Sequence, residues 1–533
     1  MKVLIFHGYL LRGTGSNVYN ANVAQALARL GHEVHLLCQD LEAASLPWVD
    51  ATGDWRGGEL RVEPTGNEGS QGDGSIAAYT PDIGGLLPVY VADTYEGFEA
   101  RTFSRLTEDE VENYIAANVA AVRQVSARAG GVDAALANHL VMGPVILARS
   151  GLPYAAKIHG SALSYTVIPE PERFGPYARE GMEAARAVLV GSRHTGVSLW
   201  ETLELDGLEE KTRLGPPGVD VEAFSPPPDR GAADRDLLAL AAEIESAPPG
   251  TGSPGLGRDP EAAAAALRSY ARGAGTGREA EDPGPRCLFV GKLIVSKGCD
   301  LLLAAWPLVV AANPDARLLL VGFGEYRDTL LRLWEALTAG DLDTTNEIIA
   351  RGRALEGGES GELSYLRSFL DNLPANYAEA AAAARDTIDL AGRLEYHEVA
   401  RAVRASDAMV VPSTFPEAFG MVAAEAAATG ALPVCARHSG LAEVAGTLAA
   451  ALEASKVTAP AARLTAFDLG PGAVEGIADR LNSWLALDPD ARAAASRALV
   501  EEVRSRWSWE GVARSVLAAS AGDLDRLDPI PPG

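Results

Sequence analysis

The chain has 533 residues, of which 47% are hydrophobic and 22% are charged, so we expect roughly two to four globular domains. A net charge of −26 repels phosphate backbones, which argues against a nucleic-acid partner and against broad docking on anionic lipid. The four cysteines, Cys38, Cys287, Cys299 and Cys435, contain no CxxC pair and predict neither a disulfide framework nor a zinc site.

The first part of the chain alternates strands and helices. KVLIF (2–6) predicts a buried strand, and a glycine-bearing turn leads into a helix capped by Ser16 or Asn17 and ended by Gly31. EVHLLC follows as the next strand, so the three elements form a β-α-β unit with parallel strands. Similar strand–turn–helix units begin at 133–140, 153–161 and 187–195, and GPPGVDVEAFSPPP (215–228) is an extended stop.

Hydrophobic segments of the sequence give no indication of a membrane protein. MKVLIFHGYL lacks the apolar stretch of a signal peptide, and no apolar run reaches the 18 to 20 residues that a membrane span needs. We therefore expect a cytoplasmic protein without a transmembrane segment.

The composition changes at 229–283, which is rich in Gly, Pro and Ala and predicts a flexible linker or surface insertion. A second α/β series then begins, with strands expected at 286–293, 317–325, 386–394, 407–415 and 432–440. Residues 327–385 are mostly helical in pattern and long for a crossover, and the chain ends in helices.

These elements predict an α/β protein with two doubly wound, Rossmann-like domains. The expected parts are an N-terminal domain (1–228), the linker (229–283), a second domain (284–505) with its helical insertion, and a C-terminal crossover helix and tail (506–533). Ligands of open α/β sheets bind beyond the carboxyl ends of the strands, so we expect the site in a cleft between the domains.

The turn RGTGSN (12–17) follows the first strand, where glycines let backbone amides approach a phosphate or a sugar. It is an incomplete dinucleotide fingerprint, because Val18 stands where the third glycine belongs, although Asp40 imitates a ribose-binding acid. A tight turn without function and an NAD site both stay open at this point.

Lys292 and Lys297 lie in the turn VGKLIVSKG after a strand, where two cations can clamp a diphosphate. Two lysines on a loop are more often simply solvated. His159, in KIHGSA after a strand, can donate to a sugar hydroxyl or a carbonyl, and His139 in ANHLVMGP is a weaker candidate of the same kind. Asp341 and Asp343 form DLD in the helical insertion rather than at a strand end, so no metal site is expected.

FPEAFGMVAAEAAATG (415–430) places Glu417 in a loop and Glu425 in an alanine-rich helix, about 12 Å apart if the segment were all helical. A capped surface helix explains it, but so does a binding site. The backbone amides available at the helix start are those of Ala418, Phe419, Gly420 and Met421.

In order along the chain, GTGSN, HG (159–160), VGSRHT, GPPGVDVEAF, VGKLIVSKG, LLLVGFGE, LAGRLEYHEV and PEAFGMVAAEAAATG resemble the motifs of the GT-B fold retaining glycosyltransferases of family 4 (glycosyl transferases group 1). The last is similar to the E-x7-E motif of that family. The resemblance covers nearly all of the chain except 229–283 and part of 327–385. It implies transfer of a sugar from a nucleotide sugar with retention of configuration and without a metal.

The resemblance also implies roles for individual residues. Lys292 and Lys297 would bind the donor diphosphate, the former where the family usually has arginine, and Glu417 would hold the sugar hydroxyls together with His159. Glu425 would accept from the ribose. The remaining implied donor contacts are the backbone of Gly15, Gly291, Arg393, Leu394, Ala418, Phe419, Gly420 and Met421.

Several rivals stay open: a GT-B nucleotide-sugar hydrolase, epimerase or phosphorylase, an NAD-dependent oxidoreductase, and a non-catalytic sugar-binding protein. The donor is expected to be a UDP-, GDP- or ADP-sugar. The acceptor, whether sugar, small molecule or lipid-linked, is expected to be read by residues 50–110, with Tyr95 and Arg101 as candidate contacts.

Overall fold

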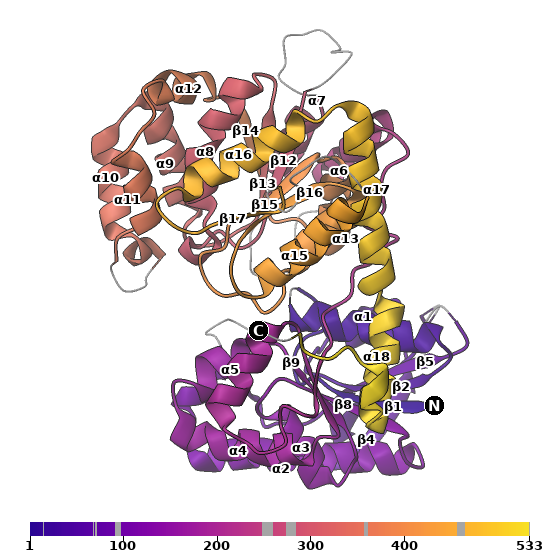
Figure 1. Ribbon diagram of the computed structural model, residues 1–533. Helices are drawn as coiled ribbons and strands as arrows, with labels where there is room; N and C mark the ends of the chain where they lie inside the picture. Colours follow the sequence, from indigo (N-terminus) through magenta and orange to yellow (C-terminus); the bar gives the residue numbers. More distant parts are fainter. Residues whose placement is uncertain are drawn as a thin grey trace. The chain divides into compact units, whose positions relative to one another are not determined.

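The computed structural model describes residues 1–13, 15–67, 69, 72–90, 97–247, 259–272, 284–356, 361–455 and 464–531. The chain forms two compact units (Figure 1). Unit 1 comprises Met1–Gly218 and Trp507–Gly533, and unit 2 comprises Val219–Arg506. Each unit is an α/β fold around its own sheet and is described by itself.

The main sheet of unit 1 has nine strands in the order β11-β10-β9-β8-β1-β2-β5-β3-β4. Neighbouring strands pair in parallel, except that β3 and β4 form an antiparallel hairpin. In that order the strands are β11 (Thr212–Leu214), β10 (Ala187–Val190), β9 (Ala155–Ile158), β8 (Ala134–Asn138), β1 (Lys2–Phe6), β2 (Glu33–Leu37), β5 (Ser75–Thr80), β3 (Ala51–Arg56) and β4 (Glu59–Pro64), with β6 (Leu86–Val89) and β7 (Glu99–Thr102) in a separate small sheet.

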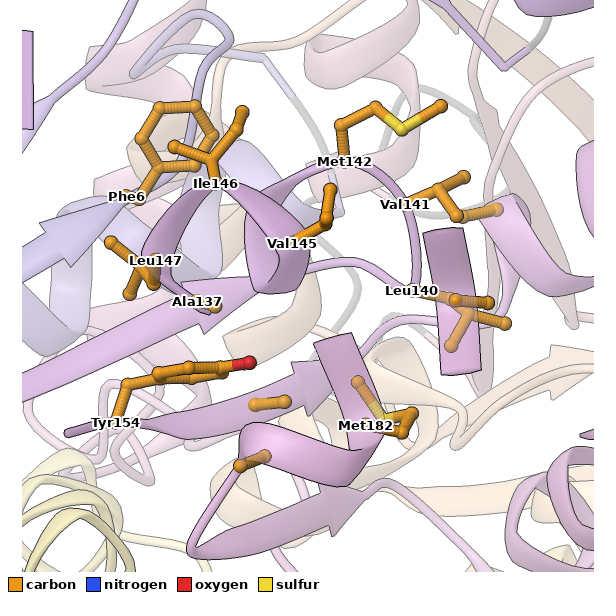
Figure 2. Packing of buried hydrophobic residues seen from close by; sticks show 14 of the residues in the cluster. Phe6, Ala137, Leu140, Val141, Met142, Val145, Ile146, Leu147, Tyr154 and Met182 are labelled. Carbon is orange, nitrogen blue, oxygen red and sulfur yellow. The ribbon is translucent and has the colours of Figure 1, made fainter. Parts of the chain in front are cut away.

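Hydrophobic side chains cover both faces of this sheet. Along β1, Val3 and Ile5 enter one core cluster and Leu4 and Phe6 the other, as the two-residue period of a strand requires. Figure 2 shows part of the cluster that contains Leu4 and Phe6, in which Phe6 packs beside α3 (Gly143–Ser150). The helices of unit 1 are α1 (Ser16–Arg29), α2 (Glu108–Arg128), α3 (Gly143–Ser150), α4 (Pro171–Ala184), α5 (Arg193–Leu203) and α18 (Trp509–Ala521), with short helices at Ala43–Ser45, Phe103–Arg105, Leu163–Val167 and Leu524–Arg526.

The last α-helix, α18, belongs to unit 1 although it lies near the C-terminus (Figure 1). Trp509 and Val516 are buried in the core cluster that also contains residues of α1. Ser520 is buried as well, and its hydroxyl donates to the carbonyl of Ala135 in β8 at 2.9 Å. The expected return of the C-terminal helix to the N-terminal domain is confirmed.

The sheet of unit 2 has six parallel strands in the order β14-β13-β12-β15-β16-β17. Numbered along the chain this is 3-2-1-4-5-6, the order of a dinucleotide-binding Rossmann sheet. Because parallel crossovers are right-handed, the reversal at β12 sends α8 to one face and α14 to the other. The strands are β12 (Arg286–Val290), β13 (Arg317–Val321), β14 (Ile388–Gly392), β15 (Ala408–Val411), β16 (Leu432–Ala436) and β17 (Ala466–Phe467).

The predicted insertion at 327–385 is helical in the residues that are described. The helices of unit 2 are α6 (Arg230–Ser246), α7 (Pro260–Arg272), α8 (Cys299–Ala312), α9 (Arg327–Ala339), α10 (Leu342–Arg351), α11 (Ser364–Leu370), α12 (Tyr377–Ala383), α13 (Tyr396–Arg404), α14 (Met421–Thr429), α15 (Ser439–Ala454), α16 (Ala473–Leu485) and α17 (Pro489–Arg506), with short helices at Val295–Lys297 and Arg353–Glu356.

The prediction of a flexible linker over 229–283 is wrong for α6 and α7, which pack on each other. In addition, α7 packs on β13 and β14, and α6 packs on α13. Leu267 and Tyr270 of α7 are buried, and the Tyr270 hydroxyl donates to the Cys287 carbonyl at 3.0 Å. The sequence interpretation gave weight to Gly and Pro in the flanks rather than to the helical spacing of the apolar residues. Those flanks, 248–258 and 273–283, lie outside the described residues.

A buried arginine connects these helices to the sheet. Arg286 of β12 is fully buried and pairs with Asp234 of α6, and it also donates to the Ala271 carbonyl of α7. An uncompensated charge at this depth would be costly, so the partners on both helices are part of the fold. Residues 219–283 therefore belong to unit 2 where they are described, and the units divide at Gly218 rather than at the expected boundary of 228.

No helix in the described parts of the chain combines the length and the apolar character that crossing a bilayer requires. The expectation of a cytoplasmic location stays a prediction.

Candidate functional site

In unit 2 the strand order reverses between β12 and β15, and ligands of such sheets bind beyond the carboxyl ends at this point. The turn after β12 carries Lys292 and Lys297, and the loop after β15 carries Glu417. The structure therefore brings two segments that are far apart in the sequence to one edge of the sheet. These are also the residues that the sequence singled out.

Lys297 and Glu417 form an ion pair in which the lysine ammonium donates to Oε1 of the carboxylate. The Ser413 hydroxyl donates to the same oxygen at 2.9 Å. Both side chains are partly open, with 33% of Lys297 and 25% of Glu417 exposed. Among the described residues nothing donates to Oε2 of Glu417, so this oxygen can accept from a ligand hydroxyl.

A hydrogen-bond chain from the next loop holds Glu417 in place. Its backbone N–H donates to the Ser439 hydroxyl at 2.8 Å, and Ser439 Oγ lies 3.0 Å from Nδ1 of His438. His438 Nε2 lies 2.6 Å from the Ser413 carbonyl, which can only accept, so Nε2 carries the proton. The sequence analysis missed His438 and Ser439, whose signal is the polar RHSG that follows β16, and Ser413, which follows β15.

Close backbone approach brings the loops together. The carbonyl of Glu417 accepts from the N–H of Gly440, where a Cβ would lie 2.6 Å from the Ala418 carbonyl. Gly298 has φ 65°, and a Cβ there would lie only 2.0 Å from the Pro412 carbonyl oxygen. A side chain at Gly298 is therefore excluded both by conformation and by contact. This packing is what carries Lys297 to Glu417.

The other lysine of the turn has a different environment. Lys292 is exposed and makes no ion pair with any described residue, so its charge is available to an anion. Gly291, expected to contact the donor, uses its N–H in a hydrogen bond to the Val321 carbonyl at 3.1 Å. This N–H is therefore part of the sheet edge, and the donor contact of Gly291 stays a prediction.

The helix that follows Glu417 begins later than a fully helical spacing assumes. α14 starts at Met421 with Gly420 as its N-cap, and no side chain caps it. The 12 Å separation calculated for an unbroken helix therefore does not apply. Backbone N–H groups of Ala418, Gly420 and Met421 make no hydrogen bond to other described residues, so they remain available to an oxygen ligand, as the sequence predicts. Phe419 is buried.

Glu425 lies in the second turn of α14 and is only 4% exposed. Burial raises its pKa to about 7; the neighbouring Tyr396 hydroxyl lowers the value and the charge of Asp220 raises it further. The ring of Phe224 packs on Tyr396 at 5.3 Å, so the GVDVEAF segment forms one wall around this carboxyl. Glu425 thus sits deeper than a solvent-facing ribose contact, and its proposed role stays a prediction.

The predicted base-binding segment follows β14. Leu394 is buried and the guanidinium of Arg393 lies 5.4 Å from the centre of the Phe323 ring, a cation–π arrangement. Arg393 also lies 3.4 Å from Glu395. Both residues follow β14 at the carboxyl edge of the same sheet, where β13 and β12 lie between β14 and β15.

In unit 1 the glycine turn after β1 leads into α1, whose N-cap is Gly15 at φ 61°. The prediction that Ser16 or Asn17 caps this helix is wrong, since both are inside it. The Asn17 side chain instead donates to the Arg12 carbonyl at 2.8 Å, which closes the turn. The uncapped start of α1 supports the predicted anion-facing role of Gly15.

Asp40, which imitates a ribose-binding acid in the sequence, supports that turn instead. Its Oδ2 accepts from the N–H of Leu11 at 3.1 Å, and its Oδ1 accepts from the N–H of Glu42 at 3.1 Å. The NAD interpretation therefore loses its acidic residue to a structural role.

Three histidines follow three adjacent strands at the carboxyl edge of unit 1: His7 after β1, His139 after β8 and His159 after β9. The rings of His7 and His139 are 5.8 Å apart, and those of His139 and His159 are 5.0 Å apart. The strand order of unit 1 reverses between β1 and β8, so this group stands at its switch point.

The hydrogen bonds of His159 decide what it offers a ligand. Asn138 Nδ2 donates to the Phe6 carbonyl at 3.1 Å, so the Asn138 oxygen faces His159 Nε2 at 2.8 Å and that nitrogen must carry the proton. Burial, reinforced by the nearby His139 and Lys157, holds the pKa of His159 well below its ordinary value. The ring is then neutral at pH 7 and Nδ1 accepts, so the expectation that it donates to a sugar hydroxyl is wrong in direction.

His139 is 3% exposed, with φ 69°, and neither ring nitrogen has a hydrogen-bond partner among the described residues. The ring centres of Tyr90 and Tyr9 lie 4.9 and 5.3 Å from that of His139.

Lys157, which the sequence analysis missed, is buried against the Tyr19 ring and donates to the Gly215 carbonyl at 2.6 Å. Burial lowers the pKa of Lys157 to about 7. Its signal is a lone lysine inside an apolar strand.

Two weaker candidates have structural roles or no description. Arg101 pairs with Glu110, the glutamate of the capping box that starts α2, and with Glu99. Its side chain is thus engaged within unit 1 rather than available to an acceptor. Tyr95 lies outside the described residues. Asp341 caps α10 as its N-cap, which agrees with its expected place in the helical insertion.

Sequence similarity to known proteins extends over part of the candidate site. Residues 376–498 match the family model "Glycosyl transferases group 1". A GDP-mannose-dependent monoacylated alpha-(1-6)-phosphatidylinositol monomannoside mannosyltransferase of Corynebacterium glutamicum is 29% identical over 229 residues, 41% of this chain and 42% of that protein. A glycogen synthase of Halorhodospira halophila is 46% identical over 116 residues, 22% of this chain and 19% of that protein. The chain thus spans less than half the length of these curated relatives.

The sucrose-phosphate synthase of Thermosynechococcus elongatus superposes with a TM-score of 0.53 over 99% of this chain and 98% of its own, at 16% identity. This likeness concerns the fold and confirms the predicted α/β architecture with two Rossmann-like units. Glu417, Glu425, Arg393 and Leu394 lie inside the matched segment, whereas Lys292 and Lys297 precede it. Residues 376–498 are therefore similar in sequence to the glycosyl transferases of group 1, a family of transferase enzymes, and the chain shares the two-unit α/β fold of its structural neighbours.

Proposed function

We propose that this chain is a glycosyltransferase of family 4 that transfers a hexose from a nucleoside-diphosphate sugar to an acceptor hydroxyl with retention of anomeric configuration. The observation that carries the proposal is the Lys297–Glu417 ion pair at the switch point of unit 2, which joins a phosphate-binding cation to a hydroxyl-binding carboxylate. The match of residues 376–498 to group 1 glycosyl transferases supports it.

The chemistry follows from the charges at this edge. The bond between the anomeric carbon and the diphosphate oxygen breaks, and its electron pair stays on the diphosphate. The ammonium groups of Lys292 and Lys297 and the free N–H groups before α14 stabilise that charge. The acceptor oxygen bonds to the anomeric carbon on the same face, and its proton goes to the leaving diphosphate.

Glu417 positions the sugar in this scheme. Oε1 is occupied by Lys297 and Ser413, so Oε2 accepts a proton from a sugar hydroxyl. A sugar held by Glu417 then has its diphosphate beside Lys297. In unit 1, His159 presents Nδ1 as a hydroxyl acceptor, and in unit 2 Glu425 accepts from the ribose.

The donor class is a UDP-, GDP- or ADP-hexose. The name of the Corynebacterium glutamicum relative specifies GDP-mannose, which supports a GDP-sugar as the first donor to test. Because the site supplies its own cations, transfer is proposed to proceed without a divalent metal. Activity that EDTA abolishes and Mg²⁺ restores would contradict this part of the proposal.

The experiment that tests the function is a thermal-shift screen with UDP, GDP, ADP and their glucose and mannose esters, followed by transfer assays with the donor that stabilises the protein. Binding at 100 times Kd stabilises the folded state by about 2.7 kcal/mol, which is a clear shift. Glu417→Ala should remove the preference for the sugar ester over the free nucleotide. Release of free sugar at the full rate without any acceptor would favour a nucleotide-sugar hydrolase instead.

A further inference from the structure

A cavity of about 360 Å³ lies in unit 1, at the carboxyl edge of β2 and β5 and against the β3–β4 hairpin. Its size is in the range of pockets that hold small molecules. Gln39 and Asp40, which follow β2, line one side, and Asp54 and Arg61 of the hairpin line another. None of the residues discussed for the donor lines this cavity.

Gln39 gives the first indication of a ligand. Its side chain is buried, and its amide nitrogen donates to the Pro81 carbonyl at 2.9 Å. That bond fixes the orientation of the amide and leaves its oxygen buried without a partner among the described residues. A buried acceptor without a hydrogen-bond partner is unfavourable, and an O–H or N–H donor from a ligand would satisfy it.

The hairpin gives the second indication. Asp54 of β3 lies opposite Arg61 of β4 and opposite Thr80 of β5 in register, so the three side chains share one face of the sheet. Arg61 makes no ion pair with another described residue, while Asp54 lies 3.1 Å from Arg56. The cavity wall thus carries a carboxylate, a guanidinium group and a hydroxyl, and it has no strong excess of either charge. Such a wall offers both hydrogen-bond donors and acceptors, which suits a neutral molecule with many hydroxyl groups.

The cavity adjoins the predicted donor loop of the same unit. Asp40 lines the cavity, and the same carboxylate accepts the backbone N–H of Leu11 in the turn after β1. Arg12 of that turn lies 3.6 Å from Asp40. A molecule in the cavity is therefore one side chain away from the turn that leads to Gly15.

We propose that this cavity binds the acceptor, and that the acceptor is a neutral sugar or glycoside recognised through its hydroxyl groups. The inference rests on the proposed glycosyltransferase function and names the substrate class that this function lacks. Gln39 and Asp54 accept from sugar hydroxyls, and Arg61 donates to them. Most of the residues that line the cavity, among them Asp54, Arg61 and Phe98, fall within 50–110, the stretch that the sequence analysis expected to recognise the acceptor.

Saturation-transfer NMR with the full-length protein tests the proposal. The probes are methyl α-D-glucopyranoside, methyl α-D-mannopyranoside and maltose, with inorganic phosphate as the anionic probe. At least one glycoside should bind the wild type, and Asp54→Asn and Gln39→Leu should each weaken it by about tenfold, the loss of one hydrogen bond to a polar anchor. Glu59→Gln, an exposed carboxylate on the same hairpin outside the cavity, should bind as the wild type does.

The outcomes separate this inference from the proposed function. If nucleotide sugars bind but no glycoside does, or if Asp54→Asn and Gln39→Leu both bind glycoside as the wild type does, the acceptor cavity is wrong and the transferase proposal stands. If a glycoside binds at Asp54 and no nucleotide sugar binds at all, the transferase proposal fails instead. Phosphate that displaces the bound glycoside would contradict the assignment to a neutral sugar.

Discussion

Lys297→Ala tests whether the ion pair at the switch point serves the reaction or only the fold. The pair with Glu417 is partly open, with 33% and 25% of the two side chains exposed. Partly exposed pairs stabilise a protein by about 1 kcal/mol or less, so Tm should fall by no more than about 2–4 °C. Removing a donor that stabilises transition-state charge instead lowers kcat by about 10²–10³-fold, or about 2.7–4 kcal/mol.

The assay combines steady-state kinetics with product inhibition by the nucleoside diphosphate. Since Lys297 is assigned to the diphosphate, its removal should also raise the inhibition constant of the free diphosphate about tenfold. Glu417→Gln should leave that constant within about twofold, because Glu417 is assigned to the sugar. Arg332→Ala, which removes a cation of α9 from its exposed pair with Glu347 of α10, is the matched control and should behave as the wild type.

Two results would refute the reasoning: a Lys297→Ala protein with wild-type kcat, or one whose Tm falls well beyond about 2–4 °C, so that lost stability accounts for the lost activity. The first result means that the cation does not meet the leaving group. The second means that the ion pair is structural and that lost activity reports an unfolded loop.

Three further predictions concern the framework of unit 2. Gly298→Ala should destabilise the protein by more than about 2 kcal/mol in urea denaturation, whereas Gly340→Ala, at φ 71° with open space around it, should lose about 1–2 kcal/mol; equal losses would show that the close approach is unimportant. Burial raises the pKa of Glu425 from 4.5 to about 7, so the folded state keeps a proton that the unfolded state loses in this range. The free energy of unfolding should therefore fall by about 3 kcal/mol between pH 4.5 and 7. Glu425→Gln should lack that part of the pH dependence. Asp234→Ala leaves a buried guanidinium without its ion partner and should destabilise by about 3 kcal/mol, whereas Glu245→Ala, in an exposed pair, should lose at most about 1 kcal/mol.

Local sequence signals predicted the elements that carry the site. The strand KVLIF and the turn after it, the lysines of VGKLIVSKG and the glutamates of PEAFGMVAAEAAATG all lie where the apolar periodicity and turn chemistry expected them. These features depend on neighbours along the chain, so a single sequence contains the information.

Other features depended on partners distant in the sequence. The linker prediction failed for α6 and α7 because the burial of Arg286 under both helices is a tertiary event that composition does not reveal. The prediction of a cap at Ser16 or Asn17 failed because the helix begins at Ser16, and the Asn17 side chain donates to the Arg12 carbonyl and closes the turn. The hydrogen bond from the Gly291 N–H to the Val321 carbonyl of the neighbouring strand likewise joins residues that are distant in the sequence.

The sequence by itself determined the α/β class, the strands that precede the predicted site residues and the identity of the charged residues at their ends, since periodicity and turn residues are local properties. It did not predict β3 to β7, β11 or β17. Only the tertiary structure decided the 3-2-1-4-5-6 strand order, the ion pair between Lys297 and Glu417, the burial of Glu425 and the direction in which His159 can hydrogen-bond. These depend on which chemical groups meet across long sequence separations, and burial together with neighbouring hydrogen bonds then sets their protonation.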